Sequence, residues 1–231
     1  MCGRQTNTFS WEEIHALLSF RPLHANFGDF DPNRKRYNLA PGQMHYVITA
    51  APEGFTAHPA RWGLVPHWAK DAAIAFRTIN ARAETVAEKP AYRDAFADGR
   101  CLIPASGYFE WTGPKSQRQP WYVLRRDGAP LFFAGVSARW LDPKSGAPLQ
   151  SYSVVTRPAE STMCELHSRM PLMLREKEFE RWLGADAGAL RALDLEHVVD
   201  ELTRHPVASR VNRTEEDDAG LLEEAGTGWL F

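Results

Sequence analysis

The middle of the chain, residues 100–156, consists of short segments rich in β-branched and aromatic side chains, separated by polar, glycine or proline breaks. Segments of this kind favour strands, and strands must pair with one another to satisfy their backbone groups. The dipeptide Asp127-Gly128 within this region is typical of a hairpin turn. The pattern therefore predicts a dense set of strands, over residues 100–104, 107–111, 121–126, 131–140 and 149–156.

The flanking segments add a few helices. Ser10 and Glu13 have the spacing of a capping box, so a short helix should begin near Ser10 and leave residues 1–9 as an extended arm. Apolar spacing predicts further helices over residues 84–96, with a kink at Pro90, and over residues 159–166, 176–183 and 186–203. Two more strands are predicted over residues 44–50 and 55–65. The fold class is α+β, with a strand-rich core of mixed or antiparallel sheet and flanking helices.

The length and charge of the chain bound its organisation. With 231 residues, one domain can bury most of its apolar surface without disulfides or metals, so we expect a single domain over residues 1–231. The net charge of −2 gives no general attraction to a polyanion, so a nucleic-acid site must be a local basic groove. The acidic residues 215–218 are interpreted as solvated surface away from any DNA, and residues 215–231 as a peripheral end.

The three cysteines, Cys2, Cys101 and Cys164, are widely spaced and include no Cys-x-x-Cys pair. This pattern indicates neither a disulfide framework nor a structural zinc site. Residues 11–15 contain two glutamates and a histidine where a signal peptide would have an apolar core, and no apolar run reaches membrane-spanning length. We expect a monomeric cytoplasmic protein in a reducing compartment, with no cofactor, no metal and no membrane association.

Cys2 directly follows the initiator methionine. Met1 is usually removed when the second residue is small, and its removal leaves a free α-amine and a thiol on one residue. An α-amine has a reference pKa of about 7.7 to 8.0, so it is unprotonated at neutral pH far more often than a lysine. The amine can condense with an aldehyde, and the thiol can then close on the imine to form a five-membered thiazolidine. The alternative is that a cysteine at position 2 has no function.

Three polar residues, Asn80, Glu110 and His167, lie within apolar or aromatic segments. Glu110 is surrounded by large aromatic residues, where a carboxylate can move protons near neutral pH, unless it faces solvent from a strand. His167 falls in a predicted loop suited to a proton donor, although a single histidine is often structural. Asn80 lies at a predicted strand-to-helix junction, where its amide can orient a reacting group or cap a helix.

Seven short motifs occur in one order along the chain. They are MCGR at 1–4, YNLAP at 37–41, WGLVP at 62–66, NARAET at 80–85, CLIPA at 101–105, GYFEW at 107–111 and HSRMP at 167–171. Together they resemble the motif set of the SOS response-associated peptidase (SRAP) family, and the match runs from residue 1 to about residue 222.

The resemblance implies an SRAP domain that senses abasic sites in single-stranded DNA. Such a domain forms a covalent DNA–protein crosslink, a thiazolidine, through the amine and thiol of Cys2 and so protects the lesion. Asn80 would position the amine, Glu110 would act as general acid and base, and His167 would help to open the sugar ring to its aldehyde. The family name also records a peptidase activity, understood as self-processing that exposes the cysteine, and only Met1 precedes Cys2 here.

The same motifs supply candidates for DNA contacts. Arginines near the site would hold phosphates, and tryptophans would stack on bases. Each can instead be an ordinary surface arginine or core tryptophan, and residues 108, 109 and 168 fall at variable positions of the motifs. The candidates are Arg4, Arg77, Arg82 and Arg169 for phosphates, and Trp68 and Trp111 for bases.

Three other functions compete with this hypothesis. Glutamine amidotransferases with an N-terminal nucleophile also begin Met-Cys-Gly, but they need an oxyanion loop that commonly contains Asn-Gly, and this chain has no Asn-Gly dipeptide. A cysteine peptidase acting in trans could pair Cys2 with His167. A non-covalent single-strand binding module would not need Cys2 at all.

Overall fold

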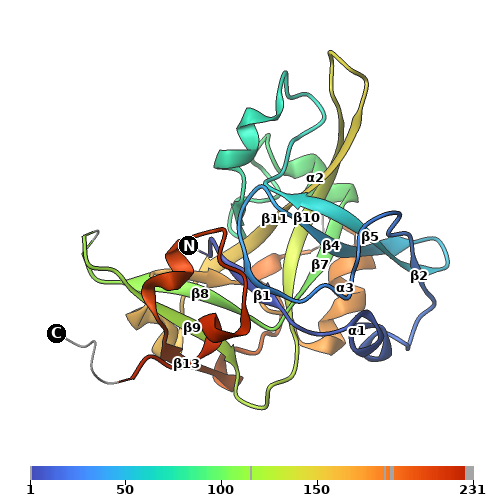
Figure 1. Ribbon diagram of the computed structural model, residues 1–231. Helices are drawn as coiled ribbons and strands as arrows, with labels where there is room; N and C mark the ends of the chain where they lie inside the picture. The colour runs from blue at the N-terminus through green and yellow to red at the C-terminus, as the bar shows by residue number, and fades with distance from the viewer. Residues whose placement is uncertain (1, 115, 185, 188–189, 227–231) are drawn as a thin grey trace.

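A closed ring of strands forms the centre of the computed structural model, which describes residues 2–114, 116–184, 186–187 and 190–226 (Figure 1). Neighbouring strands around the ring pair in the order β11-β10-β7-β4-β5. The ring closes because β5 also pairs with β11, in parallel, at Arg61 with Ser151 and at Trp62 with Tyr152. The five strands are β4 (Met44–Ala51), β5 (Gly54–Trp62), β7 (Arg100–Ala105), β10 (Leu131–Leu141) and β11 (Pro148–Pro158).

A second sheet packs beside the ring and contains the first strand of the chain. Its order is β13-β9-β8-β1-β3, and every pairing in it is antiparallel. The short strand β1 is therefore central in this sheet, with a partner on each side. The strands are β1 (Gln5–Asn7), β3 (Arg36–Leu39), β8 (Gly107–Thr112), β9 (Gln119–Arg125) and β13 (Leu202–Pro206).

Three short strands extend the ring at its rim. β2 (Leu23–Ala25) runs parallel to β5. β6 (Asn80–Arg82) runs parallel to β11, and β12 (Arg169–Pro171) runs antiparallel to it. On β11, Val154 pairs with Asn80 of β6 and Pro158 pairs with Arg169 of β12. β11 therefore brings two distant motifs of the sequence close together.

The helices are short and lie around the sheets. The side chain of Ser10 accepts a hydrogen bond from the backbone of Glu13, and the Glu13 carboxylate accepts one from the backbone of Ser10, which completes the capping box of α1. No helix in the described ranges is both long and apolar enough to cross a membrane. The α-helices are α1 (Trp11–Leu17), α2 (Arg93–Asp98) and α3 (Phe179–Gly184), and the 3-10 turns are η1 (Ala72–Arg77), η2 (Ser161–Glu165), η3 (Glu176–Glu178), η4 (Ala192–Asp194), η5 (Val199–Glu201), η6 (Ser209–Asn212) and η7 (Ala219–Leu222).

Two large apolar clusters fill the two faces of the ring. One is built around Tyr46, Leu102 and Trp182 and packs under the helices. The other contains Cys2 and Trp62 and fills the space between the ring and the second sheet. Every residue of β7 is buried, as expected for a strand covered on both faces.

The strand-rich α+β prediction is confirmed, and most predicted strands lie within two or three residues of their observed bounds. The helix near Ser10 is also confirmed. Of the extended arm predicted over residues 1–9, residues 5–7 form β1, and this part is not free, because β1 is buried between β3 and β8. The predicted removal of Met1 stays a prediction, because Met1 lies outside the described residues.

Three helix predictions are wrong in extent. Of residues 84–96, only the segment from Arg93 onward is α-helical. Of residues 159–166, Ser161–Glu165 form the 3-10 turn η2. Residues 186–203, of which 188 and 189 lie outside the described residues, contain the turns η4 and η5 and the start of β13. Pairing of β13 with β9 excludes a helix at its last two residues, Leu202 and Thr203.

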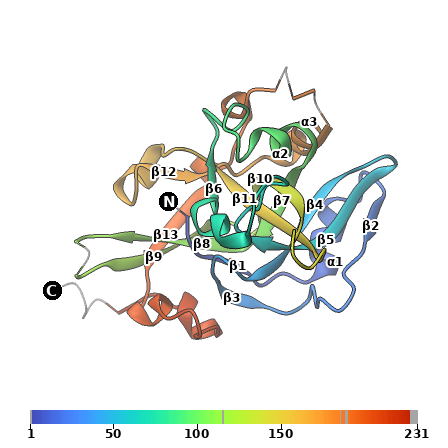
Figure 2. The same cartoon turned by 90° about the horizontal axis from the view of Figure 1, so that it is seen from above.

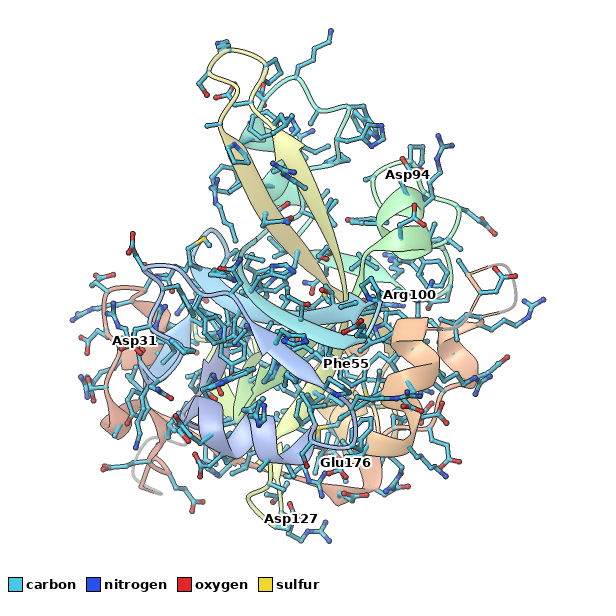
Figure 3. The ribbon with its side chains drawn as sticks, turned by 90° about the vertical axis from the view of Figure 1, so that its right-hand side faces the viewer. Asp31, Phe55, Asp94, Arg100, Asp127 and Glu176 are labelled. Carbon is cyan, nitrogen blue, oxygen red and sulfur yellow. The ribbon has the colours of Figure 1, made fainter. Side chains whose placement is uncertain are left out.

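The hairpin predicted at Asp127-Gly128 is also wrong. The two residues do end a turn, closed by a hydrogen bond from Gly128 N to Arg125 O of 3.1 Å. However, β9 and β10 on its two sides belong to different sheets. The hairpin of this region joins β10 to β11 through residues 142–147, and Figure 3 shows Asp127 at the opposite end of the molecule from it.

His45 on β4 makes stability depend on pH. Its ring Nε2 donates to the carbonyl oxygen of Pro104 at 2.9 Å, and burial lowers its pKa to about 4. An unfolded chain takes up a proton on this histidine below pH 6.5, whereas the folded chain does not. Stability is therefore lost as pH falls, by about 2 kcal/mol between pH 7 and pH 5.

We expect His45→Gln to reduce this pH dependence, because the amide keeps a donor without a titrating group. The measurement is the free energy of unfolding from denaturant titrations at pH 7 and pH 5. His24→Gln is the matched control, since His24 is exposed on β2. An equal pH dependence in wild type and His45→Gln would show that His45 is not the cause.

Candidate functional site

The pairing of β1 with β8 places the start of the chain against the GYFEW motif. Gln5 lies opposite Tyr108, and Phe109 N donates to Arg4 O at 3.0 Å, so the ladder continues towards the N-terminus. Because side chains alternate along a strand, Tyr108 and Glu110 share one face of β8. Tyr108 packs in the same cluster as Cys2. The register therefore brings Cys2 and Glu110 together.

The Cys2 side chain is completely buried, with 0% of its surface exposed. Its Sγ lies 3.7 Å from the carbonyl oxygen of Arg4. Burial raises the pKa of the thiol well above its usual range, and the nearby negative charge of Glu110 raises it further. The sulfur is accordingly a neutral thiol at physiological pH, which is the form expected of a group in a dry site.

Asn80 contacts Cys2 directly. The side-chain Nδ2 of Asn80 donates to the backbone carbonyl oxygen of Cys2 at 2.7 Å. The backbone carbonyl oxygen of Asn80 accepts a hydrogen bond of 3.0 Å from the Tyr92 hydroxyl. The Oδ1 atom of Asn80 is buried and has no hydrogen-bond partner among the described residues. A buried amide oxygen of this kind is an acceptor available to a donor beside Cys2.

His167 lies in the loop that precedes β12. Its Nδ1 accepts a hydrogen bond of 2.9 Å from Arg169 N, so in the neutral ring the proton is on Nε2, which can donate. The flanking residues Leu166 and Met170 both pack in the cluster that contains Cys2. Within the described ranges no hydrogen bond joins His167 to Cys2, so the structure brings the loop to the site without a direct contact between the two residues.

An ion pair ties the Asn80 segment to the His167 loop. Arg169 donates to both carboxylate oxygens of Glu84, at 2.7 and 2.8 Å, and also to the hydroxyl and carbonyl oxygens of Thr156 on β11. Arg169 holds the pKa of Glu84 below its usual value. This bidentate contact fixes the motifs NARAET and HSRMP relative to each other.

A polar cleft of about 600 Å³ opens beside Gly3. Arg4 and Trp111 line it, as do residues that the sequence did not single out. These belong to the loop between β8 and β9 and to η6, whose sequences have no periodicity or motif that could reveal them. They are Ser116, Gln117, Arg118, Ser209 and Asn212.

Arg4 is held by the protein itself. Its guanidinium donates to Asn38 Oδ1 at 2.6 Å and to the carbonyl oxygens of Val211 and Asn212 at 2.6 and 3.1 Å. Trp111 Nε1 donates to Asn212 Oδ1 at 2.8 Å, so the turn η6, which accepts from Arg4, also positions the Trp111 ring. Contact of Arg4, Arg169 or Trp111 with DNA stays a prediction.

The remaining candidates for DNA contacts are Trp68 and Arg77, on the segment between β5 and β6, and Arg82, the last residue of β6. Arg77 and Arg82 are exposed. Trp68 is 49% exposed, and its Nε1 donates to the carbonyl oxygen of Pro90 at 3.3 Å. Figure 2 shows the start of the chain between β6 and β12 on one side and β8 on the other, so this segment adjoins the site.

The acidic block was predicted to be solvated surface, and this is wrong for part of it. Asp217 accepts hydrogen bonds from Tyr37 N at 2.5 Å and Asn38 N at 2.9 Å, and it pairs with Arg36 at 2.9 Å. The block also lies near the cleft, because the charge of Glu215 acts on Arg4. Asp217 therefore supports the YNLAP motif that holds Arg4.

No group of three or more histidine, cysteine, aspartate or glutamate side chains in the described ranges is arranged to hold a metal ion. The candidate reactive groups at this site are those of Cys2, Asn80, Glu110 and the His167 loop.

Comparison with known proteins assigns the family. The family model "SOS response associated peptidase (SRAP)" matches residues 1–214. The chain belongs to the SRAP family. Abasic site processing protein YoaM of Bacillus subtilis is 32% identical over 96% of this chain and 98% of its own length. Abasic site processing protein YedK of Escherichia coli is 27% identical over 96% and 99%.

The fold comparison agrees with this assignment. A solved structure of a protein from Bacteroides thetaiotaomicron superposes with a TM-score of 0.80 at 23% identity, covering 97% of this chain and 100% of that one. The SRAP resemblance predicted from the seven motifs is thus confirmed. The roles of individual site residues stay predictions.

Asp217 offers a test of the support for Arg4. We expect Asp217→Ala to lower the free energy of unfolding by about 2–3 kcal/mol, because two backbone N–H groups and Arg36 lose a charged acceptor. Denaturant titration measures the change. Glu215→Ala, an exposed residue of the same acidic block, should change stability by less than about 0.5 kcal/mol. Equal effects of the two substitutions would contradict the support role.

Proposed function

We propose that this protein traps abasic sites in single-stranded DNA by forming a covalent thiazolidine with Cys2 after Met1 is removed. The observation that carries the proposal is the meeting of Cys2, Asn80 and Glu110 at one buried point, at the very start of the chain. Relatives across most of the chain are named abasic site processing proteins, which supports abasic DNA as the substrate.

The α-amine makes the first bond in this scheme. A thiol whose pKa is raised by burial and by Glu110 is a poor nucleophile at neutral pH, because the thiolate is the reactive form. The α-amine of Cys2 has no such restriction once it is freed. The unpartnered Oδ1 of Asn80 can accept a hydrogen bond from that amine and orient its lone pair towards the aldehyde.

The chemistry balances without any further reactant. The ring-closed sugar opens when the bond between C1′ and the ring oxygen breaks, with a proton delivered to that oxygen and one removed from the C1′ hydroxyl. The amine then adds to the aldehyde carbon, and loss of water gives the imine. The Cys2 sulfur bonds to the same carbon while its proton moves to the nitrogen, which completes the ring.

Glu110 and His167 serve as the proton carriers. Glu110 can protonate the hydroxyl that leaves as water and then accept and return a proton as the thiol adds. His167 can donate from Nε2 to the sugar ring oxygen, because its Nδ1 is already held by Arg169 N. The cleft beside Gly3, the residue that follows the buried Cys2, can hold a strand, and Arg77 and Arg82 are exposed for phosphates.

A cysteine peptidase acting in trans is less well supported. Such an enzyme needs a thiolate, which is normally maintained by a histidine or another positive charge beside the cysteine. Here Glu110 places a negative charge near Cys2, which opposes thiolate formation. This charge arrangement suits an amine nucleophile with a neutral thiol.

The crosslink itself is tested with single-stranded oligonucleotides that carry one abasic site or none, analysed on denaturing gels. We expect a heat-resistant adduct only with the abasic strand, and none with Cys2→Ala. Cys2→Ser should form an imine that borohydride traps but no stable ring, because its hydroxyl is a weaker nucleophile than a thiol.

Cys164→Ala is the matched control for Cys2, since Cys164 is an exposed thiol that the scheme does not use. It should crosslink as well as wild type. The intact mass of the purified protein shows whether Met1 has been removed, as the scheme requires. Crosslinking by Cys2→Ala at the wild-type level would overturn the proposal.

Glu110→Gln separates proton transfer from DNA binding. We expect crosslinking at saturating protein to slow by on the order of 100-fold, because general acid–base catalysis typically contributes this much. DNA affinity, measured by fluorescence anisotropy, should stay within about twofold. Glu178→Gln, a buried glutamate of η3, is the matched control. A loss of affinity with an unchanged rate in the bound complex would refute the role of Glu110.

A further inference from the structure

A cavity of about 280 Å³ lies beyond the end of β1 that is distant from Cys2. Asn7, the last residue of β1, lines it, together with residues 29–34 and the first residues of β3 and β4. Among the described residues, none lines both this cavity and the cleft beside Gly3. We call it the Asn7 cavity.

Asn7 brings a buried polar group to this cavity. The residue is 1% exposed, and its Oδ1 has no hydrogen-bond partner among the described residues. The other polar atom of the side chain, Nδ2, donates to the Tyr46 hydroxyl over a long 3.5 Å. Buried acceptors are normally satisfied, so the free Oδ1 indicates a donor that the chain itself does not supply.

The rim of the Asn7 cavity is held in place by local contacts. Asn33 Oδ1 accepts from Trp11 N at 2.7 Å, which ties the rim to α1, and Asp31 Oδ1 accepts from Asn33 N at 2.9 Å. Figure 3 shows Asp31 at the outer edge of the molecule. On the side of β3, Arg36 pairs with Asp217 at 2.9 Å. The cavity is therefore formed before any ligand enters, as is usual for sites of small molecules.

Two side chains of opposite charge on the cavity are free. In the part of the chain that the structure describes, neither the Asp29 carboxylate nor the Arg34 guanidinium has a hydrogen bond or an ion pair, and the two do not pair with each other. A purely cationic ligand would be repelled by Arg34, and a purely anionic one by Asp29. A zwitterion matches both charges.

The rest of the lining includes apolar side chains. Phe30 and Tyr46 meet edge to face, with 6.4 Å between their ring centroids. Met44 lies on the same face of β4 as Tyr46, two residues before it, and is 39% exposed. A flexible methionine adapts its shape to what it contacts. The uncharged part of a ligand in this cavity is therefore apolar.

We propose that the Asn7 cavity binds a free amino acid with an apolar side chain. Its ammonium group would donate to Asn7 Oδ1 and to the Asp29 carboxylate, and its carboxylate would accept from the Arg34 guanidinium. Its side chain would pack on Phe30 and Met44. The proposal does not rest on the proposed function, because it involves neither DNA nor any atom of Cys2.

Isothermal titration calorimetry with the purified wild-type protein tests the class of ligand. The probes are L-leucine, L-methionine and L-phenylalanine, each with one analogue that lacks the carboxylate and one that lacks the amine. For leucine these analogues are 3-methylbutylamine and 4-methylpentanoate. We expect at least one amino acid to bind with a dissociation constant below about 1 mM. Its two analogues should bind about 10- to 100-fold more weakly, because each loses a charge-assisted hydrogen bond. Absence of binding by all three amino acids would overturn the proposal.

Variants of the two exposed charges locate the ligand without disturbing the buried strand β1. Arg34→Gln and Asp29→Asn should each weaken binding of the amino acid by about tenfold or more. Lys35→Gln is the matched control, since Lys35 is an exposed cation next to Arg34 that does not line the cavity. It should bind the amino acid as wild type does. An equal loss in Lys35→Gln and Arg34→Gln would contradict binding in the Asn7 cavity.

Two further measurements exclude other occupants. Adenosine monophosphate could place its phosphate on Arg34, but we expect no binding, because the phosphate would meet Asp29 and Asp31. Binding of this nucleotide and of no amino acid would refute the proposal. Crosslinking of Arg34→Gln to abasic DNA should equal that of wild type. Its loss would show that the cavity belongs to the DNA site, and the amino-acid proposal would fail.

Discussion

The position of Cys2 depends on how β1, a strand of only three residues, is held between β3 and β8. Its polar side chains are buried, and Thr6 is in hydrogen-bond contact with Ser106, Gly107 and Tyr122. These contacts fix the register, and a slip by one residue would turn every side chain of the strand to the opposite face. The register in turn sets Cys2 beside Glu110. Residues this near the start of a chain are otherwise often poorly ordered.

Burial at this point determines which atom of Cys2 can react first. A dry site with a neighbouring carboxylate disfavours the thiolate, and it equally protects the sulfur from oxidation, since susceptibility follows thiolate character and exposure. The amine and the thiol therefore have separate tasks in the proposed chemistry. The same burial allows Asn80 to act through a short hydrogen bond to the Cys2 backbone, in surroundings where such bonds are strong.

Sequence reasoning succeeded where the determining interactions are local or belong to a motif. The capping box at Ser10 and Glu13 and most strands followed from neighbouring residues. Motifs singled out Cys2, Asn80 and Glu110, which the structure brings close together, while their roles stay predictions. It failed where tertiary packing decides, as in residues 186–203, which form the short 3-10 turns η4 and η5 and begin β13 rather than forming one helix. The ion pair of Arg169 with Glu84 could not be predicted either, because it requires both β6 and β12 to pair with β11.

The contacts of the arginines explain how a chain of net charge −2 can suit a polyanion. Arg169 is neutralised by Glu84, and Arg4 is occupied by three acceptors and lies near Glu215. Their guanidinium groups spend their hydrogen bonds on shaping the site. The exposed cations next to the Asn80 segment are Arg77, between β5 and β6, and Arg82, the last residue of β6. In the proposed function these two residues attract the strand on the Asn80 side of Cys2.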